Sequence, residues 1–208
     1  DAFSEVYVAR GFFDQRYYKD GSMEGPGNYR DSSKFKKAAE EEGISFIILD
    51  DYKKISNNLY ATGTVERVVE KYNGPKGFYL DKDLTIPDII RDDQSVGMLT
   101  DNGWIMMSGC GHSGIINTAM KLQSIKNEPV YGAIGGFHLF KASDNTISTT
   151  ANWLKNNGLT KFMGGHCTGI YAAETIADIV GITRENLSHT AIGSVLTKEL
   201  KIIRSSVE

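Results

Sequence analysis

The sequence predicts an α/β fold, with strands early in the chain and alternating strands and helices later. Three observations support this prediction. Short β-rich runs recur through the first half of the chain, Asp101-Asn102-Gly103 separates two such runs in the manner of a hairpin turn, and apolar spacing typical of helices begins at residue 115. The 208 residues are enough for one domain of good size or for part of a larger one. We expect a single domain over residues 1–208.

The first half of the chain holds short strands between polar loops. Ser32 or Ser33 is placed to cap a helix that runs through Glu42, and Gly43 directly after it is a typical helix end. Runs rich in β-branched and aromatic residues predict strands at 6–9, 44–49 and 59–64. Glycine-rich and polar stretches predict loops at 20–33 and 73–77.

The second half alternates between the two kinds of element. Residues 95–100 and 104–108 flank the hairpin turn as its two strands. The helix expected at 115–125 shows helical spacing most clearly, because Ile115, Ala119 and Leu122 fall on one face. Further strands are predicted at 130–134, 161–163, 191–196 and 200–203, and further helices at 146–156 and 170–180.

Charge and hydropathy exclude several classes of function. A net charge of −3 and a pI near 5.9 give no reason to expect a nucleic acid or an anionic membrane as partner. No apolar run approaches the ~18 residues that a membrane-spanning helix needs. The two cysteines are too few for a disulfide framework, which favours a reducing, cytoplasmic location.

Three of the four histidines occupy the same kind of position, directly after a predicted strand and among glycines. They are His112, His138 and His166. Strand ends are where α/β proteins gather ligands, and neutral imidazole is a common nitrogen donor to zinc and iron. One such histidine alone is more often structural than a ligand, and no HExxH, CxxC or HxH spacing occurs in the chain. The prediction of a metal site therefore rests on the recurrence of three histidines in the same position after a strand.

The residues beside these histidines have competing interpretations. Cys110 and Cys167 are candidates for soft metal ligands or thiol nucleophiles, but we favour small buried packing residues, because sequence neighbours on a turn usually point apart. Ser113 and Thr168 precede predicted helices, so each can cap the next helix while its backbone N–H faces a substrate anion. Of these two roles, capping is the stronger expectation. His189 lies outside the pattern and is expected to be structural or exposed.

Four sequence blocks resemble, in the same order, those of one branch of the metallo-β-lactamase superfamily. They are Asp92-Asp93-Gln94, Ser108-Gly-Cys-Gly-His112-Ser-Gly-Ile-Ile-Asn117, Gly135-Gly-Phe-His138-Leu139 and Gly165-His166-Cys-Thr-Gly169. The branch includes metal-dependent hydrolases and the dihydropterin-type, methanopterin-related synthases. The resemblance covers most of the chain and is strongest from Asp92 to Gly169. Four blocks in the same order are a more specific match than any one of them.

The resemblance implies an αββα sandwich with a two-metal centre between the sheet edges. It implies that His112 and His166 are metal ligands and that His138 either ligates a metal or lines the site. The implied metal is zinc, with iron or manganese as alternatives and two ions in the complete protein. Substrate contacts are expected from Ser113, Thr168 and Gly169. The implied reaction is hydrolysis of a small molecule, phosphorylated or pterin-like, by a metal-activated water.

The chain departs from this family in one large respect. The superfamily's HxHxDH motif, which supplies four ligands to the metal pair, does not occur in the sequence. The chain thus resembles a C-terminal portion, incomplete at its N-terminus, and we expect it to be inactive alone. Its expected partners are a small-molecule substrate, the missing N-terminal segment of the same protein and, through uncovered apolar faces, further copies of itself. Two alternatives stay open: a non-catalytic fragment or subunit that needs this segment, and a thiol-based binding or redox module at Cys110 and Cys167.

Overall fold

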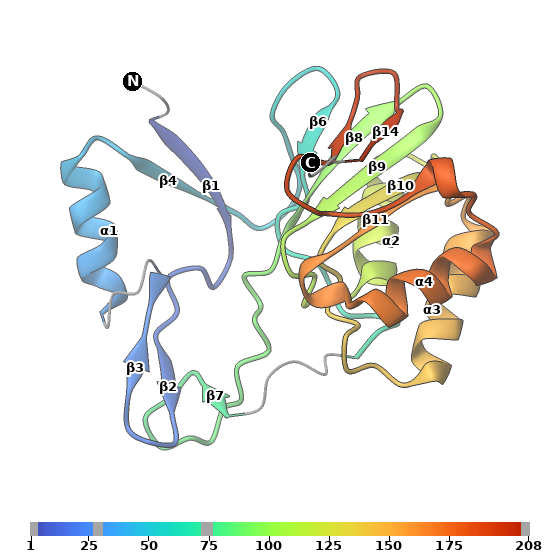
Figure 1. The fold of residues 1–208 in the computed structure, drawn as a ribbon. Helices are drawn as coiled ribbons and strands as arrows, with labels where there is room; N and C mark the ends of the chain where they lie inside the picture. Colours follow the sequence, from blue (N-terminus) through green and yellow to red (C-terminus); the bar gives the residue numbers. More distant parts are fainter. Residues whose placement is uncertain (1–3, 27–30, 72–76, 205–208) are drawn as a thin grey trace.

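The computed structural model describes residues 4–26, 31–71 and 77–204, and the chain forms two lobes in Figure 1. The larger lobe contains a seven-stranded sheet with its helices. The smaller lobe, formed mostly by the N-terminal part of the chain, contains two small sheets and a helix. All three loops that carry the singled-out histidines belong to the larger lobe.

The seven-stranded sheet is mixed and has the order β12-β11-β10-β9-β8-β6-β5. Strands β9 to β12 are parallel, whereas β8, β6 and β5 continue the sheet with antiparallel pairs. The strands are β5 (Lys53–Lys54), β6 (Leu59–Ala61), β8 (Ser95–Thr100), β9 (Gly103–Ser108), β10 (Val130–Gly135), β11 (Lys161–Gly164) and β12 (Leu187–His189). The parallel part positions the site, because parallel strands bring their carboxyl ends to one edge of the sheet.

Three helices cover one face of this sheet (Figure 1). They are α2 (Ile115–Ile125), α3 (Asp144–Asn156) and α4 (Ile170–Val180). Their inner faces join the sheet in one buried cluster that includes Trp104 of β9, Ile116 of α2 and Ile147 of α3. Burying each large apolar side chain contributes roughly 1.5–3 kcal/mol, so this cluster is the main stabilising feature of the larger lobe.

Local sequence fixes the ends of these helices. At the start of α3 the Ser143 hydroxyl oxygen accepts the N–H of Thr146, which satisfies one of the otherwise unpaired donors of the first turn. At the end of α4 Gly181 adopts a left-handed conformation with φ of 85°, which favours glycine. Short 3₁₀ turns precede α4 and β12, at His166–Thr168 and Arg184–Asn186.

Aromatic packing organises the smaller lobe. Strand β1 (Glu5–Ala9) pairs in parallel with β4 (Ser45–Leu49), and α1 (Ser32–Glu41) contributes Phe35 to the packing beside them. Four rings with centroids 5.0–6.5 Å apart fill this junction: Phe12, Phe13, Phe35 and Phe46. The smaller lobe also holds one antiparallel sheet formed by β2 (Arg16–Tyr18), β3 (Met23–Glu24) and β7 (Phe78–Tyr79). Elsewhere, near the C-terminus, β13 (Val195–Leu196) pairs with β14 (Ile202–Ile203).

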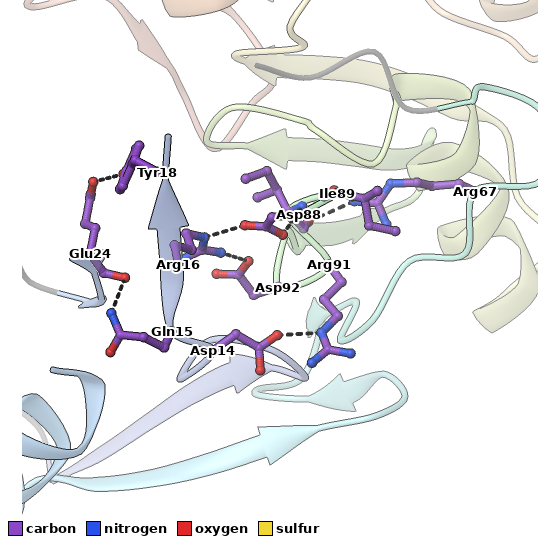
Figure 2. Close-up of polar contacts among 11 residues, drawn as sticks. Asp14, Gln15, Arg16, Tyr18, Glu24, Arg67, Asp88, Ile89, Arg91 and Asp92 are labelled. Carbon is purple, nitrogen blue, oxygen red and sulfur yellow. Dashed lines mark hydrogen bonds and ion pairs between the residues drawn. The ribbon is translucent and has the colours of Figure 1, made fainter. Parts of the chain in front are cut away.

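An ion-pair cluster links β2 of the smaller lobe to the segment that leads into β8, as Figure 2 shows. Arg16 of β2 donates from Nε to Asp88 at 2.6 Å and from Nη2 to Asp92 at 2.5 Å. The Asp88 side chain is only 1% exposed. Arg91 pairs with Asp14 at 2.5 Å, where both side chains are more exposed. Because a buried carboxylate without its partner is strongly destabilising, Arg16 fixes the segment that leads into β8.

Most of the predicted elements are confirmed. The helices at 115–125 and 170–180 have the predicted bounds, and the hairpin of β8 and β9 differs by one residue. The predicted cap of α1 is wrong, since Asp31 rather than Ser32 or Ser33 accepts the N–H of the first turn. Strand β12 was not predicted, and the tail strands are shorter than expected.

Two of the predicted loops lie partly outside the described residues. The loop predicted at 73–77 lies, apart from Gly77, outside the described residues, as do residues 27–30 of the loop predicted at 20–33. Strand β3 lies inside the latter loop. In the three stretches that the structure describes, no helix has both the length and the apolar character needed to cross a membrane.

Candidate metal centre

Three loops at the carboxyl edge of the parallel strands carry the predicted site. They hold Cys110 and His112 after β9, His138 after β10, and His166 and Cys167 after β11. Gly135 at the end of β10 pairs with Ser108 of β9 and with Gly164 of β11. The three loops therefore begin at the same level of the sheet.

The loops bring imidazole and thiol groups together. The ring centroids of His112 and His138 lie 4.3 Å apart, and Cys110 Sγ lies 3.6 Å from His138 Nδ1. One ligand atom from each of these three residues lies within 4.8 Å of the other two, and the same holds for Cys110, His166 and Cys167. Because Cys110 belongs to both groups, a ring nitrogen of His112 and one of His166 are separated by no more than twice that distance. The structure thus gathers the three histidines that the sequence singled out.

The backbone of these loops is tightly constrained. His138 and His166 both have φ of 50°, in the left-handed region that non-glycine residues adopt at a cost of about 1–2 kcal/mol. Gly136 lies where the loops touch: a Cβ there would lie 2.4 Å from the carbonyl oxygen of Gly109 and 3.0 Å from Cys167 Sγ. Strained backbone of this kind clusters at functional sites, and here it occurs at two of the three histidines.

The Asp93 carboxylate is a member of the site that residue spacing alone did not single out. Its Oδ2 accepts the N–H of Ser113 at 2.8 Å. Burial lowers the pKa of His112, with a further contribution from His138, and burial also lowers the pKa of His138. The negative charge of Asp93 opposes both shifts. Both imidazoles are therefore neutral at physiological pH, which is the form that binds a metal.

Glu70 and Asn117 hold the start of α2, directly after the loop that carries His112. Glu70 Oε2 accepts the N–H groups of Ile116 at 2.6 Å and Asn117 at 3.2 Å. The Asn117 side-chain oxygen accepts the N–H groups of Val68 and Val69. Burial raises the pKa of Glu70 to about 7. These bonds join segments more than forty residues apart and fix the position at which α2 begins.

The residues predicted to contact substrate are engaged inside the protein. Ser113 and Thr168 are buried; the Ser113 N–H faces Asp93, and the Thr168 hydroxyl bonds the backbone of the loop after β10. The capping role expected of both residues is wrong. The N-cap residues of α2 and α4 are Gly114 and Gly169, with φ of 92° and 78°, conformations that favour glycine over serine or threonine. A substrate contact by Ser113, Thr168 or Gly169 stays a prediction.

The two cysteines differ from expectation, whereas His189 does not. Cys110 and Cys167 are partly exposed, so their interpretation as buried packing residues is wrong. Partial burial and the neighbouring Cys167 thiol raise the pKa of Cys110 to about 12, which keeps this thiol protonated in the metal-free protein. His189 lies outside both ligand groups; its Nε2 is 3.0 Å from a carboxylate oxygen of Glu174.

The donors fit a divalent transition metal. Imidazole nitrogen and cysteine sulfur are donors that zinc and iron accept, with bonds of about 2.0–2.3 Å. Two such donors on one tetrahedral ion therefore lie about 3.3–3.8 Å apart. The donor atoms in each ligand group all lie within 4.8 Å of one another, so side-chain movements of about 1 Å suffice to bring three donors to one ion.

The chain is similar in sequence to two known proteins. No family model matches the chain. A 7,8-dihydropterin-6-methyl-4-(beta-D-ribofuranosyl)-aminobenzene-5'-phosphate synthase of Methanocaldococcus jannaschii is 33% identical over 143 residues, covering 66% of this chain and 48% of that protein. An uncharacterized protein of the same organism is 31% identical over 135 residues, covering 64% and 48%. The chain thus spans about half the length of the curated relatives it matches.

A solved structure shows the fold. The crystal structure of Tm1679, described as a metal-dependent hydrolase of the beta-lactamase superfamily, matches with a TM-score of 0.71 at 20% sequence identity. The match covers 90% of this chain and 69% of that one. The αββα fold class predicted from the sequence is confirmed by this match. The chain therefore has the metallo-β-lactamase fold and is related in sequence to a dihydropterin-type synthase, as its four sequence blocks indicated.

Proposed function

We propose that this protein acts as a metal-dependent hydrolase on a small substrate that is phosphorylated or pterin-like. The observation that carries the proposal is the convergence of His112, His138 and His166 at one edge of the sheet, where two ligand groups that share Cys110 suit an adjacent pair of ions. Zinc suits these donors best, with iron or manganese as alternatives. The fold shared with Tm1679 supports a hydrolytic role.

The role of each residue in the proposed site follows from its chemistry and its contacts. When bound, a divalent ion polarises the scissile carbonyl or phosphoryl oxygen and brings the pKa of a water molecule close to neutrality. His112 and His138 are neutral imidazoles able to hold such an ion together with Cys110, and the exposed His166 belongs to the second ligand group that includes Cys110. The Asp93 carboxylate offsets positive charge in the site, and its bond to the Ser113 N–H fixes its direction.

An aromatic surface beside the donors suits a flat heterocycle. Phe140 is 51% exposed, and its ring meets that of His138 edge-to-face at 5.3 Å. The Lys141 ammonium lies 5.2 Å from the centroid of the Phe140 ring. A planar ring can stack on Phe140 for about 0.5–1.5 kcal/mol while Lys141 attracts a phosphate group. The relative from Methanocaldococcus jannaschii is named as a 5'-phosphate synthase, which supports a phosphorylated substrate.

Hydrolysis of an aryl phosphate and of pterin phosphates tests the proposal. Protein stripped with a chelator is reloaded with zinc, manganese or ferrous ion, and His112→Ala is compared with His189→Ala as the matched control. Because the chain is expected to be inactive alone, turnover is measured with and without an added polypeptide that carries the HxHxDH motif. We expect this turnover to require metal and to fall at least about 100-fold in His112→Ala. The control should keep its activity, because His189 lies outside both ligand groups. Turnover that is equal with and without metal contradicts the proposal.

A test of the substrate class uses Phe140→Ala. Loss of the stacking surface should raise KM for a pterin phosphate about tenfold and leave KM for a small aliphatic phosphate nearly unchanged. Equal effects on both substrates contradict the pterin-like assignment and leave the metal requirement untouched.

A second candidate function is a metal-binding portion whose site is completed by a further polypeptide segment. The observation that favours it is ligand number, because the sequence holds three clustered histidines and no HxHxDH motif. Metal binding without turnover, followed by turnover when a polypeptide carrying that motif is added, distinguishes this candidate from a self-sufficient enzyme. In both cases a cytoplasmic location is part of the proposal, because two cysteines are too few for a disulfide framework.

A further inference from the structure

Cys110 and Cys167 form a thiol pair within the histidine cluster. Their sulfur atoms lie 3.1 Å apart, although the residues are 57 positions apart in the chain. Cys110 Sγ is 3.6 Å from His138 Nδ1, and both sulfur atoms lie within 4.8 Å of a ring nitrogen of His166. Cys110 is the one residue shared by the two ligand groups found in the described part of the chain.

The Cys167 sulfur is hydrogen-bonded to the backbone of both neighbouring loops. Its Sγ accepts the backbone N–H of His138 at 3.2 Å. Hydrogen bonds from the backbone to sulfur stabilise thiolates in metal sites. Its own S–H is directed to the carbonyl oxygen of Cys110 at 3.1 Å. His138 therefore approaches the sulfur pair twice, with its backbone N–H on Cys167 and its ring on Cys110.

The sulfur–sulfur distance lies between those of two chemical states. A disulfide needs about 2.05 Å, whereas two thiolates on one tetrahedral zinc ion lie about 3.7 Å apart. The observed 3.1 Å is nearer to the second value. A metal site also requires further donors, which the neighbouring imidazoles of His138 and His166 can supply, whereas a disulfide requires none.

We propose that Cys110 and Cys167 are ligands of the metal, so that the site is a mixed thiolate–imidazole centre for a thiophilic ion such as Zn²⁺. The inference rests on the proposed metal site and names its donors. As each sulfur–metal bond forms, the thiol releases its proton to solvent, so the step needs neither oxidant nor reductant. Two thiolates balance the charge of one divalent ion. Sulfur donors also disfavour magnesium and calcium, which prefer oxygen ligands.

Cobalt(II) reports the donors directly, because charge transfer from thiolate to cobalt absorbs in the near ultraviolet only when sulfur is bound. The full chain, reduced, stripped with a chelator and kept free of oxygen, is titrated with Co²⁺, and bound cobalt is measured by elemental analysis. We expect one charge-transfer band in the wild type, about half its intensity per bound ion in Cys110→Ser or Cys167→Ser, and none in the double variant. His189→Ala is the matched control and should keep the band.

Two results separate this inference from the proposed function. Bound cobalt without a charge-transfer band overturns thiolate ligation and leaves an imidazole-held metal in place. Absence of bound cobalt overturns both the inference and the proposed metal site.

A second measurement uses only the wild type and does not depend on variants that fold. The chain is treated with iodoacetamide with and without Zn²⁺, and alkylation of each cysteine is followed by peptide mass spectrometry. Zinc should slow alkylation of both Cys110 and Cys167 at least about tenfold, because a metal-bound thiolate is a poorer nucleophile. Unchanged rates under saturating zinc, or alkylation lost through formation of a Cys110–Cys167 disulfide alone, overturn the inference.

Discussion

Replacing Glu70 with glutamine should stabilise the protein at alkaline pH and leave its stability nearly unchanged in acid. Glu70 Oε2 accepts the N–H groups of Ile116 and Asn117 at the start of α2. Burial raises the pKa of this carboxyl from 4.5 to about 7. Glutamine places an oxygen acceptor at the same position but cannot ionise, so Glu70→Gln separates hydrogen bonding from charge.

The sign and size of the effect follow from the pKa values. The Glu70 carboxyl ionises near pH 4.5 in the unfolded chain and near pH 7 in the folded protein. Its contribution to stability is therefore complete below the lower value and is lost as pH rises through the higher one. A difference of this size corresponds to about 3 kcal/mol. The N–H groups at the start of α2 lower this pKa, and their effect is already contained in the net difference, so the loss stays at about 3 kcal/mol.

The assay is urea unfolding at about pH 5 and about pH 8.5 with a chelator present, so that metal binding does not contribute. Glu66→Gln is the matched control, because Glu66 is an exposed carboxylate on the same segment. Glu70→Gln should exceed the wild type by about 3 kcal/mol at the higher pH, and Glu66→Gln should follow the wild type. A Glu70→Gln protein that is less stable than the wild type at alkaline pH would refute the reasoning, because the carboxylate–helix attraction would then outweigh burial.

Two further predictions concern the lobe junction and the site loops. Arg16→Gln leaves the buried Asp88 carboxylate without its cation and should lower the free energy of unfolding in urea by about 3 kcal/mol. Arg91→Gln, at the more exposed pair, should lower it by less than about 1 kcal/mol. Equal losses would contradict the assignment of Arg16 as the buried link. Gly136→Ala places a Cβ 2.4 Å from the backbone of the neighbouring loop and should weaken zinc binding at least about tenfold by calorimetry. Gly109→Ala meets no atom within 4 Å and is the matched control, so similar affinities in the two variants would show that loop contact does not position the ligands.

Local patterns predicted the elements that depend on local interactions. The apolar spacing of 115–125 and 170–180 gave the bounds of α2 and α4, and Asp101-Asn102-Gly103 marked the hairpin of β8 and β9. Because β9, β10 and β11 are parallel and consecutive in the sheet, strand ends recognised one by one in the sequence converge in space. The positions of the three histidines follow from this topology.

Features that depend on distant contacts were outside the reach of these patterns. The role of Glu70 at the start of α2 requires a contact across 46 positions, and the cysteine pair requires one across 57. Serine and threonine were expected as caps from their usual preference, but the chain enters α2 and α4 with positive φ, so Gly114 and Gly169 occupy those positions. Strand β12 has three residues, one of them buried, which is too short for a recognisable alternation.

The central claim is that imidazoles from three loops share one metal site, and the chain's four histidines allow it to be tested residue by residue. Side-chain nitrogen resonances of ¹⁵N-labelled protein are followed by NMR during a zinc titration. The signals of His112, His138 and His166 should shift together and saturate at the same zinc concentration, while those of His189 stay in place. Zinc that perturbs His189 alone, or that leaves the signals of the three clustered histidines unchanged at saturation, would contradict the account.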